Sequence, residues 1–345
     1  MTKTTFATNN PVVKKAWEEK LVRDALKDIF FAKFTGTTSD SIVTQKNQLE
    51  KDKGDQITVA LRKRLTGAGV EEGTQMEGNE EPLATHAMQI TLKQYRNAVR
   101  DDGIMSRKRA MFEISTEATQ ALKGWMSEKI DSLHFDELGL SATGTAASKI
   151  FYKLTAGVSA TGTAATAKAA LKDAESKLTL NFISYLKTWA LTGGNRTTTP
   201  LQPVMVNGKP HYVFITHPDC LYDLRSSTEF QQAMREADTR GKENNLFSGA
   251  TAIWDNVAIF GHENCAAATD GGGASVPWAK GSLLGSQALC VAYGKRPEIV
   301  QKSFDYENEE GYSIGVVCGV KRSVYDGKDF GSVGVYLSRT NVSGL

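Results

Sequence analysis

The residues best suited to chemistry in this sequence are His217, Asp219 and Cys220, which place an imidazole, a carboxylate and a thiol within four positions. A cysteine hydrolase needs its imidazole base beside the thiol in space, and sequence neighbours at a strand-to-helix junction usually point in different directions. Pro218 favours the first turn of a helix, and Asp219 favours its positive end. We therefore interpret the cluster as the start of a helix, with a Cys-dependent hydrolase centred on Cys220 as the alternative.

Metal and nucleotide sites have weaker support in the sequence. His262, Glu263 and Cys265 are a partial ligand set with no further ligand motif nearby, and the four cysteines contain no CxxC pair. The glycines at 67–73 depart from the dinucleotide fingerprint, and no GxxxxGK[ST] phosphate loop occurs. We therefore expect no catalytic residues, no metal and no cofactor, and we expect the cysteines to be buried thiols.

The most distinctive segment runs from Leu49 to Leu83. Ile57, Val59 and Leu61 alternate with Thr58, Ala60 and Arg62, which predicts a strand with one buried face. Four glycines then interrupt any regular element, at positions 67, 69, 73 and 78. The segment therefore predicts an extended β-hairpin, and the alternation over 87–99 predicts a long returning strand.

The predicted hairpin is strongly charged, with cations before its tip and anions on the tip and return. The cations are Lys51, Lys53, Arg62, Lys63 and Arg64, and the anions are Glu71, Glu72, Glu77, Glu80 and Glu81. An arm this polar buries little of its own surface and is suited to lie on another molecule of complementary charge. The cations could bind phosphates, but no aromatic residue that could stack on bases lies nearby. An acidic patch on a neighbouring protein is the partner that we expect.

Helical spacing predicts two long helices around this hairpin. Residues 11–33 carry apolar residues at helical intervals, namely Val13, Trp17, Leu21, Ala25 and Ile29. The clearest helix spans 106–134, with Ser106 as its cap and apolar residues through about seven turns. On this helix His134 lies between acidic residues, and we expect it on a solvated face.

The rest of the chain mixes helices and strands. Residues 141–165 contain SATGTAA twice, at 141–147 and 159–165, which we interpret as a small-residue linker. Helices are predicted over 166–190, ended by Gly193 and Gly194, and from Pro218 to about residue 237. Strands are predicted at 212–216, 257–260, 288–293, 312–325 and 332–338. Because no regular βαβ alternation appears, the fold class is α+β.

Several motifs in and around the hairpin resemble the major capsid proteins of tailed bacteriophages, in the N-four-like podovirus family. They are GDQIT at 54–58, LRKRLTGAG at 61–69, EGNEE at 77–81 and QYRNAVRDDGIMSRKR at 94–109, with weaker matches along most of the chain. The resemblance implies the Hong Kong-type phage capsid fold and five regions. These are an N-terminal arm and helix (1–45), an extended loop with its returning strand (46–100), a peripheral domain with spine helix 106–134 (101–165), a mainly axial domain (166–300) and C-terminal strands closing the core (301–345).

The resemblance also implies a structural function, in which many copies form hexamers and pentamers of an icosahedral shell around packaged DNA. Contacts with the adjacent subunit are then expected from the extended loop, at Arg62, Lys63, Arg64, Gly67, Gly69, Glu77, Glu80 and Glu81. In this loop, Gly67 and Gly69 would let the tip turn. Trp17 and Leu21 are expected to pack on a neighbour or on the spine helix. An encapsulin-like compartment shares the fold and is the alternative shell.

The expected partners are the chain itself, a portal, a separate scaffolding protein and a decoration protein, with non-specific contact to DNA. The 345 residues carry 41 Lys and Arg against 39 Asp and Glu, a net charge of +2, which argues against gripping nucleic acid over the whole surface. No apolar run approaches the roughly 20 residues of a membrane helix, and the N-terminus lacks a signal-peptide core. We expect assembly in the host bacterial cytoplasm and a final location in the virion.

Overall fold

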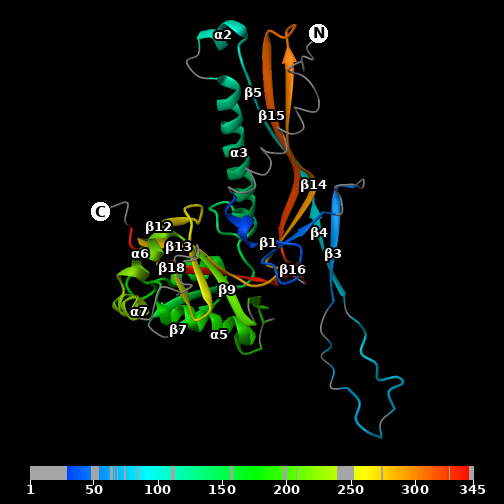
Figure 1. Ribbon diagram of the computed structural model, residues 1–345. Coiled ribbons are helices and arrows are strands. Elements are labelled where there is room, and N and C mark those ends of the chain that lie inside the picture. The colour runs from blue at the N-terminus through cyan, green and yellow to red at the C-terminus, as the bar shows by residue number, and fades with distance from the viewer. Residues whose placement is uncertain are drawn as a thin grey trace.

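The structure is a computed structural model that describes residues 29–47, 54–62, 65, 67, 69–73, 75–83, 85–109, 113–155, 158–196, 200–206, 208–238, 252–272, 275–325 and 327–341. Within these residues the chain forms two large sheets, joined by one continuous core, and a separate two-stranded arm. Figure 1 shows the arm leaving the body at the end opposite helix α2.

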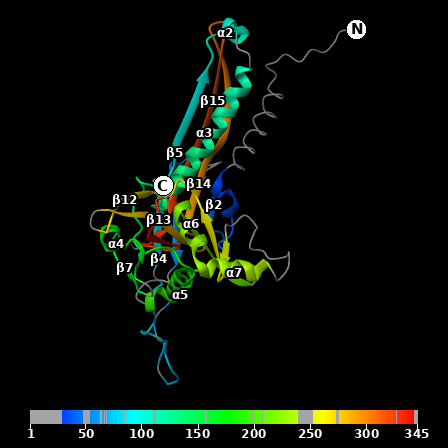
Figure 2. The same cartoon turned by 90° about the vertical axis from the view of Figure 1, so that its left-hand side faces the viewer.

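The first sheet has five strands in the order β1–β2–β14–β15–β5. Their bounds are β1 (Thr35–Gly36), β2 (Val43–Lys46), β14 (Leu289–Phe304), β15 (Glu309–Arg322) and β5 (Lys93–Arg100). Strands β14 and β15 form a long antiparallel hairpin, and β5 pairs antiparallel with β15. Helix α3 (Ile114–Glu137) lies along one face of this sheet, as Figures 1 and 2 show.

Helix α3 is the spine that the sequence predicts, and its 24 residues span about 36 Å. Its buried stripe includes Leu122, Met126 and Ile130, which share one core cluster with Ile314 and Val316 of β15. The same cluster continues past the end of α3 onto one face of the second sheet. The two sheets therefore share one hydrophobic core.

The predicted start of the spine helix is wrong. The region contains two helices, α2 (Ile104–Arg109) and α3, and Ser106 lies inside α2 instead of capping the spine. The N-cap position of α3 is Glu113. Arg107 of α2 pairs with Asp101, just after β5, and with Glu310 near the turn of the β14–β15 hairpin. These contacts hold α2 at the end of the sheet.

The predicted solvated face for His134 is also wrong. His134 is buried, and its ring stacks on Phe31 with centroids 4.9 Å apart. Its Nδ1 lies 2.6 Å from the carbonyl oxygen of Ile130, one turn earlier in α3. That bond satisfies one ring nitrogen, so the imidazole can pack as an aromatic core residue.

The second sheet has nine strands, in the order β10–β11–β9–β13–β18–β6–β7, with β12 on β13 and β8 on β9. Their bounds are β6 (Ile150–Thr155), β7 (Val158–Thr161), β8 (Val204–Val206), β9 (Lys209–Thr216), β10 (Ala252–Trp254), β11 (Val257–Gly261), β12 (Ala267–Gly271), β13 (Val276–Leu284) and β18 (Ser332–Ser338). Helices α5 (Leu180–Arg196) and α6 (Pro218–Ser226) supply residues to the core on one face. Helix α4 (Ala164–Ala170) belongs to a smaller cluster with β6, β13 and β18.

Two predicted helices are broken in the structure. The segment 166–190 divides into α4 and α5 with irregular residues 171–179 between them, and α5 continues through Gly193 and Gly194 to Arg196. The helix from Pro218 stops at Ser227, after which α7 (Thr228–Asp238) begins. The Ser227 hydroxyl accepts a hydrogen bond from the Phe230 backbone N–H, so this serine caps the new helix.

The two SATGTAA copies adopt different structures. Residues 141–147 are irregular, whereas 159–165 contribute to β7 and to the first residues of α4. Thr163 caps α4 by accepting a hydrogen bond from the Thr166 backbone N–H. The linker interpretation therefore fails for the second copy, because neighbouring strand β6 gives that copy a pairing partner.

The predicted N-terminal helix 11–33 lies mostly outside the described residues, and so do Trp17 and Leu21. Its described end is a short 3₁₀ helix, η1 (Phe30–Phe34), after an extended Ile29. The α-helical prediction is therefore wrong over its last residues.

The extended arm is the predicted hairpin, formed by β3 (Gln56–Arg62) and β4 (Thr85–Thr91). At its base Ile57, Met88 and Ile90 pack on Cys290 and Ala292 of β14. The predicted long strand 87–99 is two strands, because β4 pairs with β3 and β5 pairs with β15. A further small hairpin joins β16 (Val324–Tyr325) to β17 (Lys328–Asp329).

Candidate functional site

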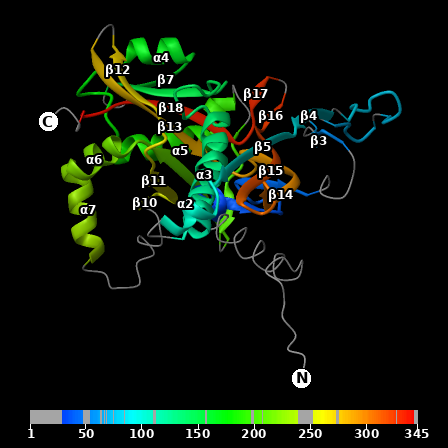
Figure 3. The ribbon, with the colours of Figure 1, turned by 90° about the horizontal axis from the view of Figure 1, so that it is seen from above.

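The loop that joins β3 to β4 projects away from both sheets. Figures 1 and 2 show it at the end of the molecule opposite α2, and Figure 3 shows the arm leaving on the side away from α6 and α7. Apart from the half-buried Val70, the described residues from 65 to 83 are exposed. The loop therefore makes little contact with the core of its own chain.

Carboxylates of the loop hold its own backbone in shape. The Gly67 backbone N–H donates to Glu81 Oε2 at 2.6 Å, and the Gly78 backbone N–H donates to Glu80 Oε2 at 2.8 Å. The Glu77 carboxylate accepts a longer bond, 3.3 Å, from the Gln75 amide. The glutamates predicted to reach a neighbour thus also order the loop, and each retains acceptor capacity for a partner.

Glycine is required at Gly67 and at Gly69 for two different reasons. Gly69 has φ +75°, in the left-handed region that glycine adopts without strain. Gly67 lies outside that region, but a Cβ there would lie 2.7 Å from Glu81 Oε2. Gly67 therefore makes room for the carboxylate that binds its own N–H.

The loop also exposes three large apolar side chains, which the sequence prediction missed. Leu65, Met76 and Leu83 are 57%, 59% and 60% exposed. They stand among five glutamates, and residues 65–83 contain no Lys or Arg. The available signal was the presence of large apolar residues in a segment otherwise rich in glycine and glutamate. Apolar side chains gathered on a polar arm are typical of a surface that another protein covers.

The cationic part of the predicted site is only partly described. Arg62 ends β3, but its side chain lies outside the described residues, as do Lys63 and Arg64. The structure therefore describes the five glutamates of the loop but, of these three cations, only the backbone of Arg62.

The His217, Asp219 and Cys220 cluster is the start of helix α6, as predicted. His217 is the N-cap, and its Nδ1 accepts a hydrogen bond from the Asp219 backbone N–H at 3.2 Å. The Asp219 carboxylate forms an ion pair with Arg339. Cys220 is fully buried, and burial raises the pKa of its thiol to about 12. The thiol stays protonated at neutral pH, which argues against the hydrolase alternative.

The remaining cysteines are buried, whereas in the partial metal set only Cys265 is buried, His262 is half-buried and Glu263 is exposed. Cys220, Cys265, Cys290 and Cys318 are buried free thiols, as predicted. His262 packs against the rings of Phe30 and Phe135, with centroids 4.7 and 4.6 Å apart. Across the described ranges, no group of three or more His, Cys, Asp or Glu residues is arranged to hold a metal.

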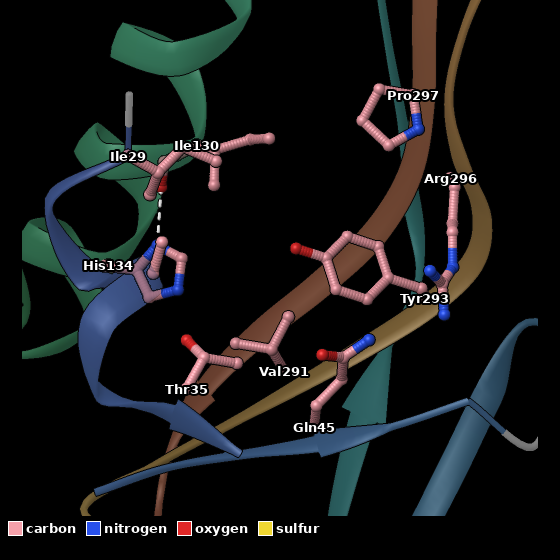
Figure 4. A pocket seen from close by; sticks show the side chains of 10 residues that line it. Ile29, Thr35, Gln45, Ile130, His134, Val291, Tyr293, Arg296 and Pro297 are labelled. Atoms are coloured by element: carbon pink, nitrogen blue, oxygen red, sulfur yellow. Dashed lines mark hydrogen bonds between the residues drawn. The ribbon is translucent and has the colours of Figure 1, made fainter. Parts of the chain in front are cut away.

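A cavity of about 220 Å³ lies between η1, α3 and β14. Figure 4 shows His134 on its helix side facing Tyr293 and Val291 on its sheet side. Burial lowers the pKa of His134 to about 4 and raises the pKa of Tyr293. Both groups are therefore neutral near pH 7, and the lining offers no thiol or carboxylate nucleophile beside the imidazole.

In the part of the chain that the structure describes, no helix has the length and apolar character to cross a membrane.

The whole chain is similar to capsid proteins of phages. A curated relative, the major capsid protein of Pseudomonas phage KPP25, is 28% identical over 97% of each chain. The solved capsid of Ralstonia phage GP4 covers 99% of both chains at 25% identity with a TM-score of 0.77. The cyanophage Pam1 capsid, at 20% identity, shows the same fold over 99% of this chain and 100% of that one, with a TM-score of 0.72. The family model described as phage capsid protein matches residues 5–338, nearly the whole length, so the chain belongs to the phage capsid protein family.

Proposed function

We propose that this capsid protein holds its neighbours through the β3–β4 hairpin and its loop. The chain is a major capsid protein of the tailed-phage fold, whose copies form the icosahedral shell of the virion. The observation that carries the proposal is the arm itself, which extends from the body with exposed Leu65, Met76 and Leu83 and five glutamates. Such an arm gains burial only against another molecule, and in a shell that molecule is the adjacent subunit.

The loop residues have separate roles in this proposal. Arg62, Lys63 and Arg64 bind carboxylates of the adjacent subunit, and Glu77, Glu80 and Glu81 contribute the anionic side of the contact. Gly69 turns the tip and Gly67 admits the Glu81 carboxylate. No single contact need be strong, because each subunit in a closed shell is held by several neighbours at once.

The remaining parts of the proposal concern organisation and partners. The five-stranded sheet with α3 acts as the peripheral domain, and the nine-stranded sheet acts as the axial domain. The hexamers and pentamers form in the host cytoplasm with a portal and a separate scaffolding protein, and a decoration protein can add to the outside. Trp17 and Leu21 pack the N-terminal arm, and packaged DNA touches the inner face without sequence specificity.

The phage shell is favoured over an encapsulin-like compartment. The matching family model and the curated relative are both phage capsid proteins, over almost the whole chain. A compartment shell would also require a cargo peptide bound inside.

The test reverses the charges at the start of the loop. Arg62→Glu with Arg64→Glu should give a folded subunit whose shell yield is roughly tenfold lower, since like charges across a contact cost several kcal/mol. The matched control is Arg62→Lys with Arg64→Lys, which keeps the charge and should assemble. Shells are counted by negative-stain electron microscopy and sedimentation, and folding is checked by circular dichroism. Normal shell yield from the Glu variant would contradict the proposed role of the cations.

A further inference from the structure

The cavity between η1, α3 and β14 is large enough for a small organic molecule. Its volume is about 220 Å³, whereas an engineered apolar cavity of roughly 150 Å³ binds benzene. Ile29, directly before η1, and Ile130 of α3 line one side, and Val291 and Pro297 of β14 line the other. These aliphatic side chains give the cavity an apolar interior that suits a hydrocarbon ring.

His134 brings a hydrogen-bond acceptor to this interior. The side chain is 3% exposed, and its Nδ1 lies 2.6 Å from the Ile130 carbonyl oxygen, so Nδ1 carries the proton of the neutral ring. The other nitrogen, Nε2, is then an acceptor. No donor among the described residues lies within hydrogen-bond distance of Nε2. Figure 4 shows this nitrogen on the side of the ring that faces the cavity.

Tyr293 brings a hydrogen-bond donor from the opposite side. It belongs to β14 and is 9% exposed, and Figure 4 shows its ring reaching from the strand toward the helix side of the cavity. Burial raises the pKa of the hydroxyl, so the hydroxyl keeps its proton and can donate it. Within the described part of the chain, no acceptor lies within hydrogen-bond distance of this hydroxyl.

The two groups favour an occupant that bonds to both of them. A buried polar group left without a partner costs about 1–3 kcal/mol, and here an acceptor and a donor are left on opposite sides of one cavity. Other polar side chains of the lining already have partners. The Thr35 hydroxyl donates to the Phe31 carbonyl oxygen at 2.9 Å, and Gln45 Nε2 donates to Asn47 Oδ1 at 2.8 Å.

The charges around the cavity favour a neutral ligand. The described lining contains no Asp or Glu, so an ammonium group would have no counter-ion there. A carboxylate group would place its charge against the lone pair of His134 Nε2. The cation of the described lining, Arg296, is exposed to solvent, where its attraction for an anion is weak.

A hydroxyl compound matches this set of groups. Its O–H can donate to an imidazole nitrogen, and its oxygen can accept from a tyrosine hydroxyl. A ring or short hydrocarbon chain attached to the hydroxyl would occupy the apolar interior.

We propose that this cavity is a binding site for a small neutral phenol or alcohol, whose hydroxyl donates to His134 Nε2 and accepts from the Tyr293 hydroxyl. The ligand would contact α3 and β14 at once, so its binding stabilises the packing of the spine helix on the five-stranded sheet. The site is independent of the loop 65–83 and goes beyond the proposed function.

The test is a fluorine NMR titration of the full chain, kept unassembled, with three one-ring probes. The probe 4-fluorophenol carries the hydroxyl, fluorobenzene lacks it, and 4-fluorobenzoate replaces it with a charge. We expect 4-fluorophenol to bind with a Kd of about 1 mM, which is within reach of a ligand of this size. Fluorobenzene and 4-fluorobenzoate should bind roughly tenfold more weakly, because each leaves His134 Nε2 without a donor.

Two variants remove one hydrogen-bonding group each. Tyr293→Phe removes only the hydroxyl, and it should reduce the preference for 4-fluorophenol over fluorobenzene about fivefold. His134→Phe removes the acceptor and should reduce the preference by a similar factor. The matched control is Tyr185→Phe, which removes a half-exposed hydroxyl on α5, away from the cavity, and should leave the preference unchanged. Thermal melts check that each variant is folded.

Four results would overturn the inference. If 4-fluorophenol shows no binding up to about 10 mM, the cavity holds water only. If fluorobenzene binds as tightly as 4-fluorophenol, the cavity selects only apolar volume, and tighter binding of 4-fluorobenzoate would indicate an anion site. If Tyr293→Phe behaves like Tyr185→Phe, the probe binds elsewhere on the subunit.

Discussion

At the scale of single residues, Arg322 and Asp329 form a buried ion pair that needs both partners, because a charge left alone in the core is costly. Arg322 Nε lies 2.8 Å from Asp329 Oδ1, and the other carboxylate oxygen accepts the Ser148 backbone N–H at 2.6 Å. The same guanidinium donates to the carbonyl oxygens of Thr145 and Ala146. The pair therefore ties the irregular first SATGTAA segment to the end of β15 and to β17.

Asp329→Ala should destabilise the subunit strongly. Asp329 is 1% exposed, and its loss leaves the Arg322 charge buried without a carboxylate, which costs about 3–5 kcal/mol. Urea unfolding of the unassembled subunit measures the change. Lys328→Ala, at the exposed neighbouring position, should change stability by less than about 0.5 kcal/mol. Equal effects of the two substitutions would refute this account of the pair.

His134 should make the unassembled subunit sensitive to acid. Burial lowers its pKa from 6.5 to about 4, so between these pH values the unfolded chain binds a proton that the folded chain does not. Stability therefore falls as pH drops from 6.5 towards 4, by about 3 kcal/mol from this group, and levels off below that. Stability curves from pH 7 to 4 should be flatter for His134→Phe than for the original chain. Parallel curves would mean that His134 is not the group responsible.

At the scale of elements, the alternation of apolar and polar residues predicted strands correctly. Apolar residues at helical spacing, by contrast, predicted helices that are too long. The strands around 57–61, 212–216, 257–260 and 332–338 all appear, because each alternating or apolar run is buried where the pattern indicates. The helices at 106–134, 166–190 and after Pro218 each break in two. Arg107 of α2 pairs with Glu310, a contact distant in sequence that leaves no periodic signal, whereas α7 begins at the local cap of Ser227.

The position of the candidate site could be predicted from the sequence, but the hydrogen bonds within its loop could not. Charge and glycine content located the loop, but Gly67 and Glu81 meet across fourteen positions in a bond that spacing does not suggest. The face of the five-stranded sheet opposite α3 was not predicted at all, because its residues come from β5, β14 and β15, which only the folded sheet brings together.

The crossing of β4 over β15 depends on a residue without a side chain. A Cβ at Gly319 would lie 2.5 Å from the Thr91 carbonyl oxygen, which is backbone and cannot swing away. Gly319→Ala should therefore destabilise the subunit by about 1–3 kcal/mol and shift the base of the arm. Thermal melts, with shell yield as a second measurement, test this.

Gly124→Ala is the matched control for that substitution. It lies on the exposed side of α3 with open space around it, and it should stabilise by up to about 1 kcal/mol through helix propensity. A Gly319→Ala subunit as stable as the original chain would show that the strands part easily at this crossing.

At the scale of the whole molecule, two packed sheets form a body from which one arm projects. The cluster that runs from the five-stranded sheet across α3 to the nine-stranded sheet makes the body one folding unit. The loop 65–83, by contrast, exposes Leu65, Met76, Leu83 and its five glutamates. Such a subunit buries the exposed apolar residues of its loop only when copies assemble. Many weak contacts between subunits then together hold a stable shell.

The measurement that tests the central claim most directly is negative-stain electron microscopy of the purified full chain, together with its sedimentation profile. The account predicts closed shells, tubes or isolated hexameric rings, with sedimentation far faster than that of a 37.5 kDa subunit. A monodisperse monomer or dimer that persists at high concentration and with added scaffolding protein would contradict it.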